Sequence, residues 1–306
     1  MLRIGAPFYG TKRDQIPDPS FFQAAEATLF NRADLEKSSW SLVWKNLARA
    51  CDVYAPQCVS LHFPFNQCDY VTDPFVRARL LESLQRAENQ GMAGVVVHAA
   101  QVADIAPWTR ESPVVKRRAV ADALHEIIVK SGVKHAWLAL ENLPVIGNFG
   151  KEIDPTYVYP ADFAALDGTQ IKVAWDFCHF MITLEVGSDP KRIGMTASSF
   201  PFLQPVQPDD YRSIQNRIVH WHFSGFKGLP LKQHNIRTHE GLHPLESDGS
   251  INLYATFAHA MLKHTSSSLC MLEVTEENYC QRVNARKVKI WLTNLHEIAN
   301  TTATGY

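Results

Sequence analysis

Short apolar segments rich in β-branched residues alternate along the chain with longer stretches in which apolar residues recur every three or four positions. The first pattern is typical of strands and the second of amphipathic helices, so their alternation predicts repeated β–α units. The continuous apolar character of the short segments suits parallel strands that are covered on both faces. Eight segments fit this description: Leu2–Ala6, Cys58–Phe63, Gly94–His98, Trp137–Glu141, Ile171–Asp176, Ile218–Phe223, Asn235–Glu240 and Leu269–Val274. The seventh is the weakest, because its sequence NIRTHE is mostly polar.

Three of the stretches between these segments carry an apolar stripe at helical spacing. The stripes are Val76, Leu80, Leu81 and Leu84; Val115, Ala119, Ala123, Leu124, Ile127 and Ile128; and Val288, Trp291, Leu292, Leu295 and Ile298. Asp73-Pro74 and Glu111-Ser112-Pro113 precede the first two stripes and match helix starts with proline in the first turn. Segments 7–57 and 180–217 are longer than a usual β–α connection. The second contains four prolines, and we expect it to form an irregular loop over the mouth of a barrel.

Eight β–α units in 306 residues predict one (β/α)8 barrel, a fold that typically needs about 250 residues. We find no internal repeat, low-complexity tract or linker, so residues 1–306 are expected to form a single TIM-barrel domain. The chain is 46% hydrophobic and 20% charged, which is ordinary globular composition.

The cysteines, the first residues and the net charge indicate where the protein is located and which partners it can have. The six cysteines form no CxxC pair and indicate reduced thiols. The first residues, MLRIGAPFYG, lack the features of a signal peptide, and no apolar stretch approaches the roughly 18 residues of a membrane span. We therefore expect a soluble cytoplasmic protein with no membrane partner. A net charge of −1 neither indicates nor excludes nucleic acid, because a repair enzyme needs only a local basic groove.

Imidazole and carboxylate side chains gather where the predicted strands end, which is where (β/α)8 barrels carry their functional residues. They are His62 in LHFP, His98 in VVVHAA, Glu141 in ALENLP, Asp176 and His179 in AWDFCHF, His220 and His222 in VHWHFSG, His243 in GLHPLESDG, and Glu273 in MLEVTEEN. A single histidine of this kind could be a satisfied core residue, and a single glutamate could be a salt-bridged strand end. Because acidic residues are rarely buried unpaired, their convergence on one rim predicts a metal site instead. The ligand types suit zinc, manganese or iron.

These motifs resemble those of the xylose isomerase-like TIM barrels over nearly the whole chain. Glu141, Asp176, a histidine of segment Ile218–Phe223 and Glu273 match the four-ligand site shared by the sugar isomerases, epimerases and repair endonucleases of that superfamily.

Further motifs resemble those of endonuclease IV-type apurinic endonucleases, the AP endonuclease family 2. His62 in HFPF, His98, His179 three residues after Asp176, and His243 before Asp248-Gly249 match that pattern. The resemblance implies two or three metal ions: one held by His62, His98 and Glu141; a second by Glu141, Asp176, His220 and Glu273; and a third by His179 and His243.

The sequence departs from that pattern at Gly241, where endonuclease IV-type enzymes have an aspartate. UV-damage endonucleases of the same superfamily lack this aspartate and carry a KxHFS segment. The corresponding segment here, His220-Trp221-His222-Phe223-Ser224, would make His222 the ligand and His220 its neighbour. The choice between these two histidines, and the third metal position, are therefore open.

The resemblance favours a metal-dependent hydrolase that cleaves a phosphodiester or related phosphate ester. Glu141 would bridge two metal ions, and Glu273 would be a ligand that also orients the attacking water. The alternative is a sugar or sugar-phosphate isomerase or epimerase, in which Glu141 and Glu273 pass a proton across the substrate beside one metal ion. A third class is an oxidative barrel with several iron ions. The substrate is expected to be a small phosphorylated or sugar-like molecule or damaged DNA, and the oligomeric state is left open.

Overall fold

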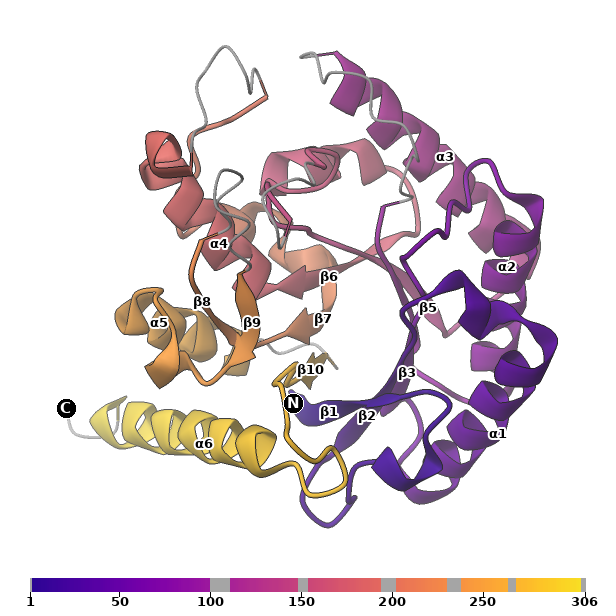
Figure 1. The fold of residues 1–306 in the computed structure, drawn as a ribbon, viewed down its shortest axis with the longest axis horizontal. Helices are drawn as coiled ribbons and strands as arrows, with labels where there is room; N and C mark the ends of the chain where they lie inside the picture. Colours follow the sequence, from indigo (N-terminus) through magenta and orange to yellow (C-terminus); the bar gives the residue numbers. More distant parts are fainter. Residues whose placement is uncertain are drawn as a thin grey trace.

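A computed structural model describes residues 2–99, 111–147, 154–193, 202–229, 238–263 and 268–303. Its centre is a closed barrel of eight parallel strands in the order β1-β10-β7-β6-β5-β4-β3-β2 (Figure 1). The strands are β1 (Arg3–Tyr9), β2 (Ala24–Thr28), β3 (Val59–His62), β4 (Gly94–Val97), β5 (Trp137–Glu141), β6 (Lys172–Asp176), β7 (Ile218–His222) and β10 (Leu269–Met271). The predicted (β/α)8 fold class is confirmed.

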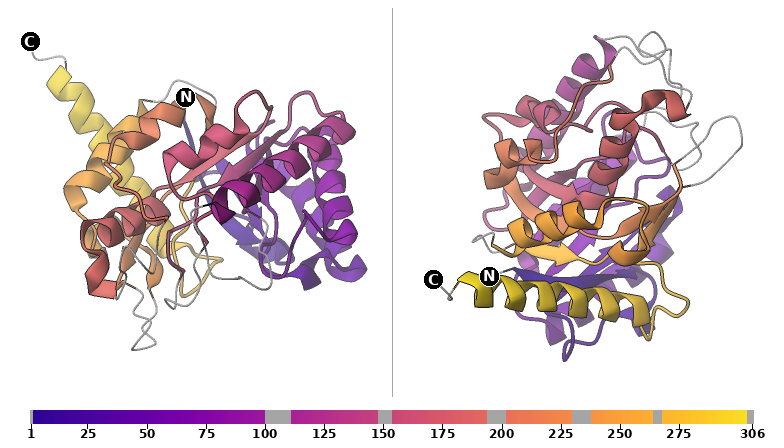
Figure 2. Two further views of the ribbon diagram at one scale, coloured as in Figure 1. Left: turned by 90° about the horizontal axis from the view of Figure 1, so that it is seen from above. Right: turned by 90° about the vertical axis from the view of Figure 1, so that its left-hand side faces the viewer.

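The helices form the outer layer around the barrel (Figures 1 and 2). They are α1 (Lys37–Val53), α2 (Pro74–Asn89), α3 (Ser112–Ser131), α4 (Phe177–Ser188), α5 (Ile251–Leu262) and α6 (Val283–Ala303). Short 3-10 helices are η1 (Arg13–Gln15), η2 (Arg32–Leu35), η3 (Pro160–Leu166), η4 (Pro190–Ile193), η5 (Asp210–Arg217) and η6 (Pro244–Glu246). In the described part of the chain, no helix is both long and apolar enough to cross a membrane.

The three helices predicted from apolar stripes are present. At the start of α2, the Asp73 carboxylate accepts hydrogen bonds from the N–H groups of Phe75 and Val76, and Pro74 occupies the first turn. The buried face of α2 includes Val76, Leu80 and Leu84, as the stripe indicates. In α3, the stripe residues Ala123, Leu124, Ile127 and Ile128 are buried, whereas Val115 and Ala119, nearer the start of the helix, are exposed.

One of the eight predicted strands is wrong. Only residues 238–240 of the polar segment 235–240 are described, and they lie outside the barrel: His239 and Glu240 begin β9 (His239–Leu242), which pairs antiparallel with β8 (Gly225–Lys227). This two-stranded ribbon lies beside the barrel, between α4 and α5 (Figure 1).

The eighth barrel strand is β2, inside segment 7–57. Its sequence, AAEAT, holds alanine and glutamate, which are poor strand formers, so intrinsic propensity does not reveal it. All five residues are buried between β1 and β3, and burial on both faces decides the conformation instead.

The segment 180–217 is also more regular than predicted. Instead of an irregular loop, α4 continues to Ser188, and η4 and η5 follow in the described residues. Residues 194–201, which include two of the aromatic and proline positions behind that prediction, lie outside the described residues.

Candidate metal centre

Two layers of inward-facing side chains fill the barrel, because residues two apart on a strand point the same way. The upper layer, at the carboxyl ends, contains His62, His98, Glu141, Asp176 and His222. The lower layer holds the residues two positions earlier: Ser60, Val96, Ala139, Ala174 and His220. Three of these, Val96, Ala139 and Ala174, form a small apolar cluster. The side chains of the lower layer are therefore mostly small and apolar. His220 differs from them because it is large and polar.

Glu141, at the end of β5, lies at the centre of the upper layer and is 1% exposed. Its Oε2 atom lies 2.9 Å from His62 Nε2 and 3.1 Å from His98 Nε2. Its Oε1 atom lies 3.1 Å from Nδ1 of His222. The two oxygens of one carboxylate thus face two different sets of histidines.

Asp176 and Glu273 complete the second set. The ligand atoms of Glu141, Asp176, His222 and Glu273 all lie within 4.8 Å of one another. Asn142 fixes the end of β6, because its side chain accepts a hydrogen bond from the Asp176 N–H at 2.6 Å and donates to the Asp176 carbonyl at 2.9 Å. Glu273 follows β10, and 27% of its side chain is exposed. It is the most accessible member of this set.

The electrostatics of the set differ from one carboxyl group to the next. Burial alone would raise the pKa of Glu141, but the adjacent His222 and His98 outweigh it and hold this pKa well below its ordinary value. Burial raises the pKa of Glu273 to about 7, because the attraction of His222 is opposed by repulsion from Glu141 and Asp176. Burial likewise raises the pKa of Asp176. The nearby histidines thus do not fully balance the negative charge of these three packed carboxyl groups.

The contacts of the His62 ring indicate that further positive charge is needed beside these carboxyl groups. Its Nδ1 atom lies 3.1 Å from the Phe63 carbonyl oxygen, an acceptor, so we infer that the proton of the neutral ring is on Nδ1. The Nε2 lone pair then faces the Glu141 carboxylate at 2.9 Å, which would place two acceptors in contact. Only a second proton or a metal cation reconciles this contact. The donor set therefore fits metal ions, in two groups that share Glu141 and His222.

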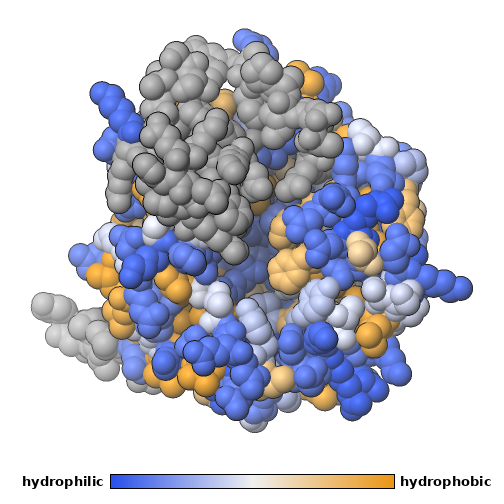
Figure 3. Space-filling model, in the orientation of Figure 1, coloured by the Kyte–Doolittle hydropathy of each residue, from blue (hydrophilic) through white to orange (hydrophobic). Residues whose placement is uncertain are grey.

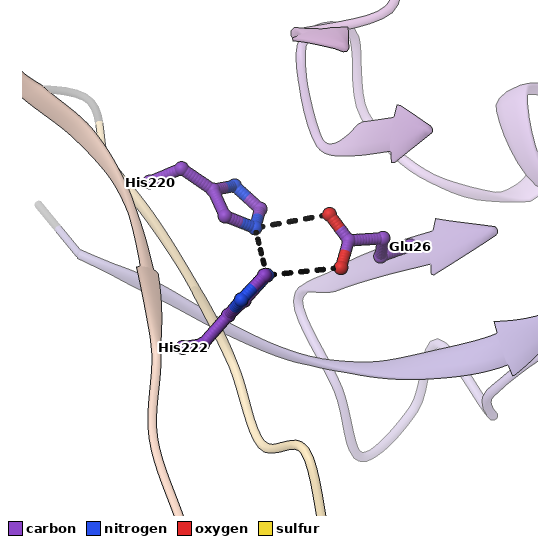
Figure 4. Close-up of side chains that lie close together, drawn as sticks. All are labelled: Glu26, His220 and His222. Carbon is purple, nitrogen blue, oxygen red and sulfur yellow. Dashed lines mark hydrogen bonds and ion pairs between the residues drawn. The ribbon is translucent and has the colours of Figure 1, made fainter. Parts of the chain in front are cut away.

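The structure places His222, and not His220, in the upper layer. Its Nδ1 atom faces Glu141 Oε1 at 3.1 Å and Glu273 Oε2 at 3.6 Å. His220 lies one layer lower, where its Nε2 atom is 3.0 Å from Glu26 Oε2 and 3.1 Å from His222 Nε2 (Figure 4). His222 thus occupies the position that the resemblance left open between the two.

Glu26, on β2, is absent from the residues predicted from the sequence. It is fully buried, and with His220 and His222 it forms a third group that could hold a metal ion by distance alone. The usable signal was the length of segment 7–57: a connection too long for one β–α unit leaves room for another strand, and Glu26 is the carboxylate in its apolar stretch AAEAT.

His179 joins the edge of the centre, whereas His243 does not. The Nδ1 atom of His179 lies 2.8 Å from the Asn142 carbonyl oxygen and 3.6 Å from Asp176, and its Nε2 atom is 3.8 Å from Glu240 on β9. His243 turns away, which corrects the expected third pair. Its Nδ1 atom accepts the Leu245 N–H, and its ring lies 5.9 Å from that of Trp291 on α6.

Gly241 explains the missing aspartate. Its φ is +81°, and a Cβ atom built there would lie 2.6 Å from Thr275 Oγ1 and 2.9 Å from the Thr275 nitrogen. This bulged position in β9 therefore requires glycine and excludes an aspartate. The acidic neighbour of His179 is Glu240 instead.

A pocket of about 330 Å³ opens beside Glu273. Its described lining is Pro7, Phe8, Tyr9, Gln15, Thr28, Phe30, Glu273, Val274, Thr275 and Tyr279, which includes four aromatic rings and no lysine or arginine. Figure 3 shows a hollow near the middle of the face seen in Figure 1, bordered mainly by hydrophilic residues. The metal centre is thus next to a space for a small molecule.

Comparisons with known proteins agree on the fold. No protein-family model matches the chain, and no curated protein matches it. Among solved structures, endonuclease IV from Thermus thermophilus is 17% identical, with 95% of this chain and 99% of that chain covered and a TM-score of 0.60. A D-tagatose 3-epimerase-like protein is 16% identical over 99% and 100% of the two chains, with a TM-score of 0.59. A xylose isomerase domain protein from Alicyclobacillus acidocaldarius is 14% identical over 98% and 100%, with a TM-score of 0.55.

The closed parallel barrel and these likenesses show that the chain has a (β/α)8-barrel fold, which it shares with an endonuclease, an epimerase-like protein and a xylose isomerase domain protein. Within that class, its imidazole and carboxylate groups could bind metal. Proteins of this fold that act on nucleic acid and on sugars are equally similar to it, so the fold alone does not separate the two activities.

Proposed function

We propose that the protein is an enzyme with two adjacent divalent metal ions that hydrolyses a phosphate ester. The supporting observation is the position of Glu141, whose Oε2 faces His62 and His98 while its Oε1 faces His222. A carboxylate arranged in this way suits a bridging ligand. His62, His98 and Glu141 would hold one ion, and Glu141, Asp176, His222 and Glu273 the other.

Metal ions at these positions would supply positive charge that activates a water molecule and stabilises both the attacking and leaving oxygens of a phosphoryl group. Zinc or manganese suits the donor set, and iron is also compatible with it. Glu273 borders the pocket, so as a metal ligand it would also be placed to orient the attacking water beside the bound ester. His179, with Nε2 unused by the backbone, would contact a phosphate oxygen or a third ion.

The organic part of the ester would occupy the pocket between Tyr9, Phe30 and Tyr279. Aromatic rings can stack on a sugar or a base, and the volume suits one such unit. We therefore favour a small phosphorylated substrate over duplex DNA, for which a basic groove would be expected.

The rival function is isomerisation or epimerisation of a sugar or sugar phosphate. It is favoured by the same pocket, whose described lining carries no lysine or arginine for a phosphate. It requires Glu141 and Glu273 to exchange protons with carbon. Glu273 meets this requirement, but three histidines hold Glu141 as an anion with a pKa well below its ordinary value. Glu141 is better suited to bind metal than to carry a proton.

The two functions are separated by Glu141→Gln. With zinc or manganese, wild-type protein is expected to cleave a generic bis-aryl phosphodiester, and the variant is expected to lose cleavage together with most of its bound metal. His243→Gln is the matched control, because that ring lies against Trp291, and its metal content should stay at the wild-type value. Abasic and UV-damaged duplex DNA and a panel of ketose phosphates complete the assay. Turnover of a ketose phosphate without cleavage of any ester would overturn the proposal.

A further inference from the structure

Below the metal centre, one carboxylate is shared by two imidazole rings. Glu26 Oε2 lies 3.0 Å from His220 Nε2, and Glu26 Oε1 lies 3.2 Å from His222 Nε2 (Figure 4). The Ser60 hydroxyl donates to Oε2 at 2.9 Å. All three ionisable residues are 0% exposed, so water cannot replace any of these partners.

The protons of both rings follow from this geometry. An ionised carboxylate only accepts hydrogen bonds, so each Nε2 atom that faces it must carry a proton. The two Nε2 atoms are only 3.1 Å apart, yet each N–H has a separate oxygen of Glu26 to bind. In the neutral ring of His222, the lone pair is then on Nδ1, which points at Glu141 and Glu273.

We propose that Glu26 is a positioning residue that fixes the tautomer and orientation of His222, so that this histidine binds metal through Nδ1. The inference rests on the proposed metal centre. A carboxylate that holds the second nitrogen of a metal-binding histidine orients the ring and makes it a stronger ligand. His220 is the second, neutral donor that keeps Glu26 in place.

The alternative, a further metal ion between Glu26, His220 and His222, conflicts with the surroundings of His220. Metal-binding histidines use their second N–H in a hydrogen bond. His62 and His179 have such a partner for Nδ1, the carbonyl oxygens of Phe63 and Asn142. The Nδ1 atom of His220 is buried and has no hydrogen-bond partner among the described residues. Metal at Nε2 would move the proton to Nδ1 and bury an unpaired donor, which is costly.

The test begins with ¹⁵N-histidine-labelled wild-type protein, observed by long-range ¹⁵N–¹H correlation without metal and after addition of zinc. The expected result without metal is a proton on Nε2 of His222 and of His220. On addition of zinc, Nδ1 of His222 should shift and both nitrogens of His220 should keep their signals. Zinc-induced loss of the His220 Nε2 proton would overturn the proposal, because it would place metal at Glu26.

Glu26→Gln then removes the charge at nearly constant volume. Zinc affinity is expected to fall about 10–100-fold, the usual effect of losing such a partner. Ser60→Ala is the matched control: it removes one hydrogen bond to the same carboxylate and leaves both histidine contacts, so the zinc affinity should stay near the wild-type value. Wild-type affinity in Glu26→Gln would contradict the positioning role.

If the proposed metal centre were wrong, the measurements would differ from those expected if only the role of Glu26 were wrong. If wild-type protein bound no zinc, the proposed function would be lost, but the wild-type spectrum without metal would still test the tautomer. Protonation of Nδ1 instead of Nε2 in His222 would then refute the role of Glu26 independently, even if the Glu26→Gln variant did not fold.

Discussion

Four of the candidate histidines differ in what they can bind, and the difference lies in the partner of the second ring nitrogen. The carbonyl oxygens of Phe63 and Asn142 face Nδ1 of His62 and His179 and leave Nε2 for the metal centre. Glu26 does the reverse for His222 and leaves Nδ1. His243 uses Nδ1 to accept a backbone N–H, which removes it from the centre. Ring orientation, and not residue identity, therefore separates ligands from neighbours.

The protonation of the centre makes metal binding depend on pH. Glu273 has a pKa raised to about 7, and the pKa of His222 is well above its usual value because Glu273, Glu141 and Glu26 outweigh its burial. Both groups bind metal only after losing a proton. Metal affinity is therefore expected to rise as pH increases through about 7, with protons released on binding.

Isothermal titration calorimetry in buffers of different ionisation enthalpy measures this release. In Glu273→Gln, which has no proton to lose at that position, fewer protons should be released per bound zinc ion. Equal release from the two proteins would show that Glu273 is already ionised in the metal-free state.

At the scale of elements, the sequence predicts the helices and strands whose positions depend on apolar periodicity and on capping residues. Helix α2 begins where Asp73-Pro74 indicates, and the strand ends bring His62, His98, Glu141 and Asp176 together as expected. Strand β2 escapes prediction because its conformation comes from burial between two neighbours, not from its own residues. Glu26 is not predicted either, because it lies on β2. The position of His243 is not predicted because tertiary contacts, and not local sequence, set the path of the chain after β9.

The bulge at Gly241 in β9 gives a test of the tertiary constraint on this strand. Gly132 also has positive φ, +67°, but a Cβ atom there would meet nothing within 4 Å, so Gly132→Ala should cost about 1–2 kcal/mol of unfolding free energy. Gly241→Ala has the same backbone strain plus the overlap with Thr275, which adds about 1–3 kcal/mol. Urea unfolding of both variants measures the difference. Equal losses would mean that the β9 bulge can move away from Thr275.

For the whole molecule, the candidate metal centre joins the strands of the barrel, since β3 to β7 and β10 each end in or beside it. Metal that binds only the folded barrel should stabilise it by about 4 kcal/mol at a free concentration about 1,000 times Kd. Chelation with EDTA is therefore expected to lower the Tm, as measured by calorimetry.

Asp176→Asn should reduce the stabilisation by metal without reducing the stability of the metal-free protein. Burial raises the folded-state pKa of Asp176, so its ionisation destabilises the metal-free protein once the pH exceeds the unfolded value. Removing the charge is expected to leave the Tm of the metal-free protein unchanged or higher, while the increase on adding zinc becomes smaller. Asp52→Asn, at an exposed position on α1, is the control and should keep the full increase. A lower Tm for metal-free Asp176→Asn would contradict this account.

The small apolar residues of the lower layer also determine how charge can reach the centre. Val96, Ala139 and Ala174 occupy the barrel at the level of His220, and the Trp137 ring, at the start of β5, lies 5.4 Å from the His220 ring. Hydrocarbon and an indole ring offer no relay for protons, so this layer insulates the strand-start end of the barrel. Because Val96, Ala139, Ala174 and Trp137 offer no relay toward the strand starts, we expect protons bound by Glu26 and its two histidines to exchange in the other direction, past the candidate metal ligands.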